Sequence, residues 1–270
     1  MSNSKKLIDL FYESKKKSIK WKKYFSVYEE LFQKYKGKKI TFIEIGILDG
    51  GSLEIWKNYF GPKAKIIGID KNYKCKNFEN ENFKIYIGSQ SDPLFWNKFY
   101  NEIGKVDIIL DDGGHTNDQQ ITSLVKSLKN INDGGLYVVE DTHTSYQKHF
   151  GNPYKYSFIN FAKKCIDDLN YNFPNFEQFR YTINNIVYSA IFYESIVAFK
   201  IDRKLCKENY KIENNGYKSN LSDVALDERF FKFRKKFRFL YKFKITSKIE
   251  RLFIKIFNRK KARLLKKYFR

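Results

Sequence analysis

Short apolar runs alternate with helix-like segments through most of the chain. Each run is about four to eight residues long and lacks the spacing of an amphipathic helix, which is typical of buried strands. The runs cover residues 40–45, 64–70, 83–88, 106–111 and 135–139. Helices are predicted between them over 53–60 and 117–128, and another is predicted to begin at Pro93 with Asp92 as its cap. This alternation predicts a parallel sheet with helices on both faces.

The pattern changes at the end of this region. Two further apolar runs, 183–192 and 196–201, are separated by only a short connection. Such a connection cannot make a parallel crossover, so the sheet is predicted to end in an antiparallel hairpin, preceded by a helix over 157–169. The predicted fold class is therefore α/β: a Rossmann-like, doubly wound, mostly parallel sheet with a C-terminal antiparallel hairpin and a basic helical tail.

The segments on either side of the sheet divide the chain into three parts. Residues 1–36 contain apolar residues at helical spacing, which predicts an amphipathic lead-in helix. These residues are Trp21, Tyr24, Tyr28 and Leu31. Residues 37–205 hold the alternating region and are the predicted catalytic domain. Residues 206–270 form a third part, in which helical spacing returns after Asp223.

The net charge of +22 is concentrated in the third part. Residues 229–270 hold 18 Lys and Arg and one acid, Glu250, so they carry +17 and the preceding residues only +5. A basic amphipathic helix fits an anionic membrane surface, so we expect peripheral contact with the inner face of the cell membrane. The alternatives left open are packing on the body or on a second protomer of a homo-oligomer, nucleic-acid binding, and a tail without a role.

The composition indicates a protein that works in the cytoplasm. Cys75, Cys165 and Cys206 are widely scattered and show no metal-binding spacing, as is typical of reduced thiols. The first residues lack the apolar run of a signal peptide. No stretch reaches the roughly 18 apolar residues of a spanning helix.

Two acidic pairs, each closing a predicted strand, give the strongest chemical signal. Asp111 and Asp112 precede Gly-Gly-His115, and Glu140 and Asp141 end the next strand. Ligands bind outside the carboxyl ends of the strands in open α/β sheets, so these groups are expected to converge there. Carboxylates favour Mg²⁺, Mn²⁺ or Ca²⁺ over zinc, and the imidazole can accept a proton. The structural alternatives are that Asp111 only caps a turn and that Glu140 and Asp141 cap the following segment.

A glycine-bearing turn over 46–52 follows the first strand. Glu44 precedes the turn, and its spacing departs from the GxGxxG dinucleotide fingerprint. Asp70 ends the second strand, where a carboxylate can bind ribose hydroxyls. The turn therefore favours a cofactor that has a ribose but no pyrophosphate, with a purely structural turn as the alternative.

Together these segments resemble a class I S-adenosylmethionine-dependent methyltransferase. The most specific motifs are Asp-Asp-Gly-Gly-His at 111–115 and Gly-Gly-Leu-Tyr-Val-Val-Glu-Asp-Thr-His-Thr-Ser-Tyr at 134–146. This pair is similar to metal-dependent sugar O-methyltransferases, which include the macrocin and mycinamicin O-methyltransferases and relatives in capsule and surface-glycan pathways. The resemblance extends from about Thr41 to Ile201.

The resemblance implies a role for each matching residue. The residues implied to bind S-adenosylmethionine are Glu44, Gly46, Gly50, Ser52, Asp70, Gln90, Asp92 and Asp111. The residues implied to hold the divalent metal, most simply Mg²⁺, are Asp112, Glu140 and Asp141. His115 would be the general base beside Asp112, and His143 and Tyr146 are weaker candidates for substrate contact. Ser89 stands where relatives commonly have an acid, which shifts the expected adenine contact toward Asp92.

The implied activity is methylation of a sugar hydroxyl in capsule, surface-polysaccharide or glycoside biosynthesis. The acceptor would be a sugar, a nucleotide sugar or a glycan. An RNA methyltransferase is one alternative, but the nearly neutral body and the lack of a recognisable nucleic-acid-binding domain argue against it. A nucleotide-dependent oxidoreductase is disfavoured by the missing GxGxxG, and a non-enzymatic glycan-assembly subunit by the intact carboxylate–histidine set.

Overall fold

The computed structural model describes four main stretches and isolated positions beyond residue 234. The stretches are residues 5–150, 154–170, 183–207 and 209–217. Met1–Lys211 form one compact unit and Ile212–Arg270 a second. The helix predicted after Asp223 lies outside the described residues, apart from isolated positions. Among the described residues, no helix has both the length and the hydropathy needed to cross a bilayer.

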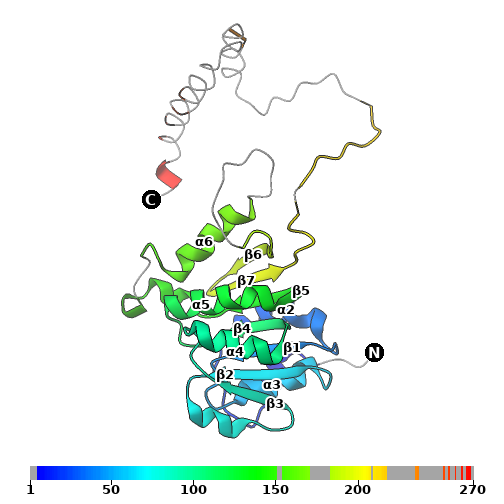
Figure 1. Ribbon diagram of the computed structural model, residues 1–270, viewed down its shortest axis with the longest axis vertical. Helices are drawn as coiled ribbons and strands as arrows, with labels where there is room; N and C mark the ends of the chain where they lie inside the picture. The colour runs from blue at the N-terminus through cyan, green and yellow to red at the C-terminus, as the bar shows by residue number, and fades with distance from the viewer. Residues whose placement is uncertain are drawn as a thin grey trace. The chain divides into compact units, whose positions relative to one another are not determined.

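A seven-stranded sheet forms the centre of the first unit (Figure 1). Its strands are β1 (Thr41–Ile45), β2 (Lys65–Asp70), β3 (Phe83–Ile87), β4 (Val106–Asp111), β5 (Ile131–Val139), β6 (Val187–Tyr193) and β7 (Ile196–Ile201). The strand order is β3-β2-β1-β4-β5-β7-β6, with β1 to β5 parallel and β7 antiparallel to both neighbours. The predicted sheet and its terminal hairpin are confirmed. The strand order reverses between β1 and β4, where ligands bind in such sheets.

Helices cover both faces of this sheet. They are α1 (Leu7–Glu13), α2 (Tyr24–Phe32), α3 (Gly51–Phe60), α4 (Pro93–Ile103), α5 (Asn117–Ser127) and α6 (Phe158–Leu169). Helices α1 to α3 pack in one hydrophobic core, and α4 to α6 pack in the other. Phe42 and Ile43, neighbours on β1, belong to different cores because successive strand residues face opposite sides. Asp92 caps α4 with Pro93 at its start, as predicted.

The lead-in consists of two helices instead of the single helix predicted. Residues 14–23, here called the strap, separate α1 from α2 and form no regular helix. The apolar face of α2 is buried as predicted, but Trp21 lies in the strap. The strap crosses the start of α3 closely: a Cβ on Gly51 would lie 2.5 Å from the Lys17 carbonyl oxygen. This packing directs the strap over the carboxyl edge of the sheet.

Candidate active site

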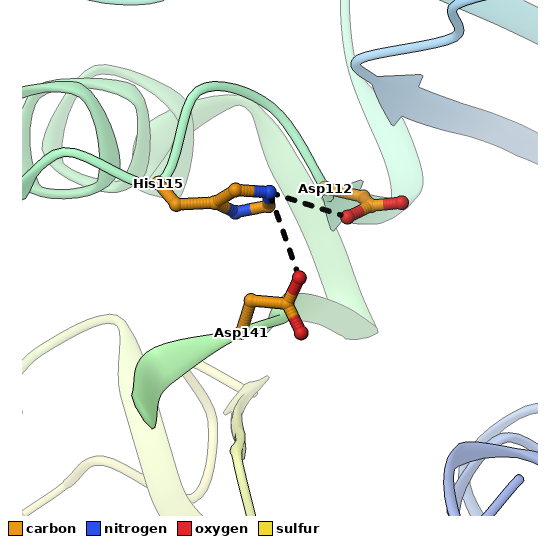
Figure 2. Close-up of side chains that lie close together, drawn as sticks. All are labelled: Asp112, His115 and Asp141. Atoms are coloured by element: carbon orange, nitrogen blue, oxygen red, sulfur yellow. Dashed lines mark ion pairs between the residues drawn. The ribbon is translucent and has the colours of Figure 1, made fainter. Parts of the chain in front are cut away.

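Loops that follow β4 and β5 bring an imidazole and two carboxylates together. His115 Nε2 lies 3.8 Å from Asp112 Oδ1 and 3.6 Å from Asp141 Oδ2 (Figure 2). One donor atom from each of the three residues lies within 4.8 Å of the others, so the group has the geometry of a metal site. The predicted convergence at the carboxyl edge therefore includes these three residues.

The backbone at this edge is strained in a consistent way. Among the described residues, four that are not glycine have positive φ: Leu48, His115, Asp141 and Ser195. All four belong to the turns at the carboxyl edge or to the hairpin beside them. Such conformations cost about 1–3 kcal/mol each and cluster at functional sites. The strain supports the assignment of function to this edge.

A lysine of the strap reaches the same carboxylates. Lys20 Nζ lies 2.5 Å from Asp112 Oδ2, and its side chain is only 6% exposed. It also lies 3.1 Å from Glu140 and 3.7 Å from Glu44. Burial alone would lower the pKa of Lys20, but the charges of its three carboxylate partners raise that pKa well above its usual value. The ammonium is therefore charged in this position.

Glu44 and Glu140 are fully buried acids behind this lysine. The Ser52 hydroxyl donates a hydrogen bond to Glu44 at 2.6 Å, and the Tyr28 hydroxyl donates one to Glu140 at 2.5 Å. Burial raises the pKa of both carboxyls, and the charge of Asp112 raises the pKa of Glu140 further. Both carboxyls are therefore held out of water, where the charged form needs a cationic partner.

Asp111 takes a different position from Asp112. Its buried carboxylate accepts hydrogen bonds from Ser123 at 2.6 Å, Tyr137 at 2.9 Å and Gln90 at 2.9 Å. Burial raises the pKa of Asp111. Gln90 also accepts a hydrogen bond from the Gly114 amide at 2.9 Å. Asp111 and Gln90 thus support the loop that carries His115, and Glu44, not Asp111, joins the acidic cluster.

A cavity of about 310 Å³ lies over the first turn of the fold. Among the residues predicted to bind the cofactor, Gly46, Asp70 and Gln90 line this cavity. Gly46 has φ +84°, and a Cβ there would lie 2.1 Å from the Asp112 carbonyl oxygen. Glycine therefore lets the turn pack directly against the loop that carries Asp112. The cavity also includes Asp112 and His115 in its lining.

The other predicted cofactor residues lie outside the lining of this cavity. Glu44 and Ser52 contact one another, and Gly50, with φ +70°, is the cap residue immediately before α3. Asp92 accepts a hydrogen bond from the Leu94 amide at 2.8 Å as the cap of α4. Ser89, by contrast, does line the cavity. The placement therefore favours Ser89 and Gln90 over Asp92 for an adenine contact.

A second cavity, of about 380 Å³, lies beside Asp141. It is lined by Trp21, Lys22, Lys23, Tyr24, His143, Glu194 and Ser195. The Tyr24 hydroxyl lies 2.5 Å from Asp141 Oδ1, and His143 Nδ1 lies 2.5 Å from Ser195 Oγ. Tyr146 is 53% exposed and lies outside the lining of both cavities. Of the two weaker substrate candidates, only His143 is brought to a cavity beside the cluster.

Comparison with known proteins shows which sequences the chain resembles. No protein-family model matches the chain. The chain is 32% identical over 158 residues to 8-demethyl-8-alpha-L-rhamnosyl tetracenomycin-C 2'-O-methyltransferase from Streptomyces olivaceus, covering 55% of this chain and 41% of that protein. It is 33% identical over 131 residues to mycinamicin VI 2''-O-methyltransferase from Micromonospora griseorubida, covering 46% and 32%. About half of the chain is thus similar in sequence to sugar O-methyltransferases. It spans less than half the length of these curated relatives.

Solved structures show the same fold. The mycinamicin-pathway methyltransferase MycE in complex with Mg and SAH is 25% identical, with a TM-score of 0.65 over 75% of this chain and 55% of that chain. MycE with Mg, SAH and mycinamycin VI gives 24% identity and a TM-score of 0.66 over the same shares. The class I methyltransferase fold is thus confirmed.

Several residues at the site were not predicted from the sequence. Lys20 and Tyr28 contact Glu140, and Tyr24 and Ser195 lie against Asp141 or His143. The only sequence signal for Lys20 is that it separates two bulky apolar residues within a lysine-rich stretch. Ser195 has no such signal in the sequence, because the tight turn between β6 and β7 is what brings it to the site.

Proposed function

We propose that this protein is an S-adenosylmethionine- and divalent-metal-dependent O-methyltransferase that methylates a sugar hydroxyl. The observation that carries the proposal is the position of the acidic cluster. The 310 Å³ cavity reaches Asp112 and His115, and the 380 Å³ cavity reaches Asp141 through Tyr24. A methyl donor in the first cavity and an acceptor in the second would therefore meet at the cluster. S-adenosylmethionine supplies the methyl group as a sulfonium when it is bound.

The acidic cluster has the donor chemistry of a hard divalent cation site. Carboxylate oxygens are the preferred ligands of Mg²⁺. Three carboxylates, those of Glu44, Asp112 and Glu140, lie around one ammonium, and the Asp141 carboxylate lies next to them beside His115. We propose that Asp112, Glu140 and Asp141 hold the cation. When bound, it would lower the pKa of a coordinated hydroxyl.

His115 is better suited to take a proton than to bind the cation. A metal-binding histidine almost always donates its second ring N–H to a carboxylate, a carbonyl or water. Nδ1 of His115 is buried and has no hydrogen-bond partner among the described residues. Nε2 faces Asp112 and Asp141. We propose that Nε2 accepts the hydroxyl proton during the displacement.

The 380 Å³ cavity is the proposed acceptor site. Trp21 is 61% exposed and presents an aromatic face, while His143 and Ser195 supply polar groups. Such a mixture suits a sugar ring, which has apolar C–H faces and hydrogen-bonding hydroxyls. The acceptor would be a sugar, a nucleotide sugar or a glycan in capsule, surface-polysaccharide or glycoside biosynthesis.

Replacing Trp21 with alanine is expected to raise the KM for the acceptor about threefold to tenfold. A well-placed aromatic contact contributes about 0.5–1.5 kcal/mol, and removing it leaves the cofactor cavity intact. Tyr146→Ala is the matched control, because Tyr146 is an exposed aromatic outside both cavities. Steady-state kinetics with varied acceptor would test both variants. An equal rise in KM in both would place the acceptor elsewhere.

The proposed function is tested first by binding of S-adenosylhomocysteine. The chelator-treated protein would be titrated calorimetrically with and without Mg²⁺, and micromolar binding is expected. Absence of binding under both conditions would overturn the assignment. Screening of sugar nucleotides and glycosides for methylation follows a positive result.

Asp70→Ala is expected to weaken S-adenosylhomocysteine binding by about 10- to 100-fold. Hydrogen bonds to a charged group contribute roughly 1.5–3 kcal/mol, and a ribose would supply them. Asp70 also accepts backbone hydrogen bonds from Ile47 at 3.1 Å and Leu48 at 3.3 Å, so the variant could also disturb the turn. An analogue lacking the ribose hydroxyls separates the two effects. If Asp70→Ala weakens this analogue equally, the ribose role is wrong.

The setting of the enzyme stays a prediction. We propose that it acts in the cytoplasm and that its basic tail makes peripheral contact with the membrane, which would suit lipid-linked or polymeric acceptors. Homo-oligomer formation is a further possibility for the tail. Support for these proposals comes from the charge pattern of residues 229–270, most of which lie outside the described residues.

A further inference from the structure

Lys20 occupies a singular position in the strap. The strap contains six lysines, all of them among the described residues, and five of these side chains lie in exposed residues. Lys20 instead inserts its ammonium between Asp112 and Glu140, at 2.5 and 3.1 Å. Its side chain is nearly inaccessible to solvent. An ordinary surface lysine extends into solvent, whereas Lys20 lies against two of the proposed metal ligands.

The ammonium and a divalent cation would compete for the same carboxylates, those of Asp112 and Glu140. Mg²⁺ binds carboxylate oxygens at about 2.0–2.1 Å. Lys20 already contacts Asp112 Oδ2 and both carboxylate oxygens of Glu140. Two positive charges on shared ligands repel strongly where water is excluded. Only one of them can occupy the centre of the cluster at a time.

The neighbours of Lys20 reach the two cavities. Ile19 lines the 310 Å³ cavity, and Trp21 lines the 380 Å³ cavity. Among the described residues, the main chain of residues 15–20 makes no hydrogen bond to the sheet or its helices. The strap is therefore held by its packing on α3 and by side-chain contacts, and the lack of main-chain hydrogen bonds to the sheet favours local displacement. Movement of Lys20 would shift a wall of each cavity.

We propose that Lys20 is the resident counter-ion of the cation site. It neutralises Asp112 and Glu140 in the metal-free protein and is displaced when the divalent cation binds. The strap moves with it, so cation binding reshapes the cofactor and acceptor cavities together. This inference rests on the proposed function, because it takes Asp112 and Glu140 to be metal ligands. It adds a positioning residue that sets cation affinity and couples the three sites.

Calorimetric titration of the chelator-treated full-length protein with Mg²⁺ tests the competition. Lys20→Met keeps an unbranched side chain that is one atom shorter and removes the charge, and it should bind Mg²⁺ at least about tenfold more tightly than wild type. Lys15→Met is the matched control, since Lys15 is an exposed lysine of the same strap, and its affinity should equal that of wild type. Unchanged or weaker Mg²⁺ binding by Lys20→Met would overturn the inference.

Hydrogen exchange on the wild-type protein gives a second measurement that needs no variant. Addition of Mg²⁺ should speed amide exchange in residues 14–23, while exchange in the β1 and β4 strands stays slow. Unchanged or slower exchange in the strap would contradict the displacement, even if Lys20→Met did not fold. If wild type and Lys20→Met bind Mg²⁺ equally and amide exchange in the strap does not change, this inference is wrong but the proposed metal site stands. Absence of Mg²⁺ binding in every protein would overturn the metal site as well.

Discussion

Asp112→Asn is expected to reduce methyl transfer by about a thousandfold or more, while S-adenosylhomocysteine binding is retained. Asp112 is the residue at which the 310 Å³ cavity, His115 and Lys20 meet. Asparagine keeps the size of the side chain but removes the charge that would hold a divalent cation. Lewis-acid assistance contributes several kcal/mol, and each 1.36 kcal/mol corresponds to about tenfold in rate. The loss should therefore appear in kcat.

Single-turnover rates at saturating cofactor and Mg²⁺ would measure this effect. Asp118→Asn is the matched control, because Asp118 is an exposed acid in the first turn of α5. It should retain wild-type turnover and the same thermal midpoint. Near-wild-type turnover of Asp112→Asn at normal S-adenosylhomocysteine affinity would show that the acidic cluster has no part in the chemistry.

The arrangement of Asp112, His115 and Asp141 could be predicted because it depends on a simple rule. Each residue follows an apolar run, and parallel strands place their carboxyl ends on one edge of the sheet. The strand alternation and the short link before β7 were enough to give the sheet and its hairpin. The sequence could not reveal that Asp111 faces Ser123 and Tyr137 in the interior. The orientation of Asp111 depends on these two side chains, which α5 and β5 contribute.

The lead-in shows where reasoning from periodicity fails. Trp21 and Tyr24 are three residues apart, so the pattern extends the helix through both, but α2 begins at Tyr24. The strap instead follows the carboxyl edge, where its packing on α3 and the charge of Lys20 outweigh helical preference. One buried lysine among six in the strap cannot be identified without the carboxylates that surround it. Tertiary electrostatics therefore decides the part of the site that the sequence leaves open.

Strain at His115 connects the fold to the chemistry. His115 has a φ of +58°, a conformation that costs a residue other than glycine about 1–3 kcal/mol, and its ring lies beside Asp112 and Asp141. The two glycines before it allow Gln90 and Gln119 to approach the loop closely. The local sequence thus selects an orientation of the imidazole, not merely its presence.

His115→Asn is expected to lower kcat by about 10²- to 10⁴-fold, the range attributed to general-base assistance. Asparagine tolerates the left-handed backbone of this position better than alanine does, so the loss would report on proton transfer instead of loop distortion. Cofactor affinity and the KM for the acceptor should change little. His115→Ala should lose activity equally, with an additional loss of stability.

The split between kcat and KM separates His115 from His143. In His115→Asn the loss should appear in kcat, because the proposed proton acceptor is gone while the acceptor cavity stays intact. His143→Asn is the matched variant, because His143 lines that cavity and contacts Ser195. It should keep most of kcat and raise the KM for the acceptor. Loss of kcat in His143→Asn with near-wild-type kcat in His115→Asn would assign the base to His143.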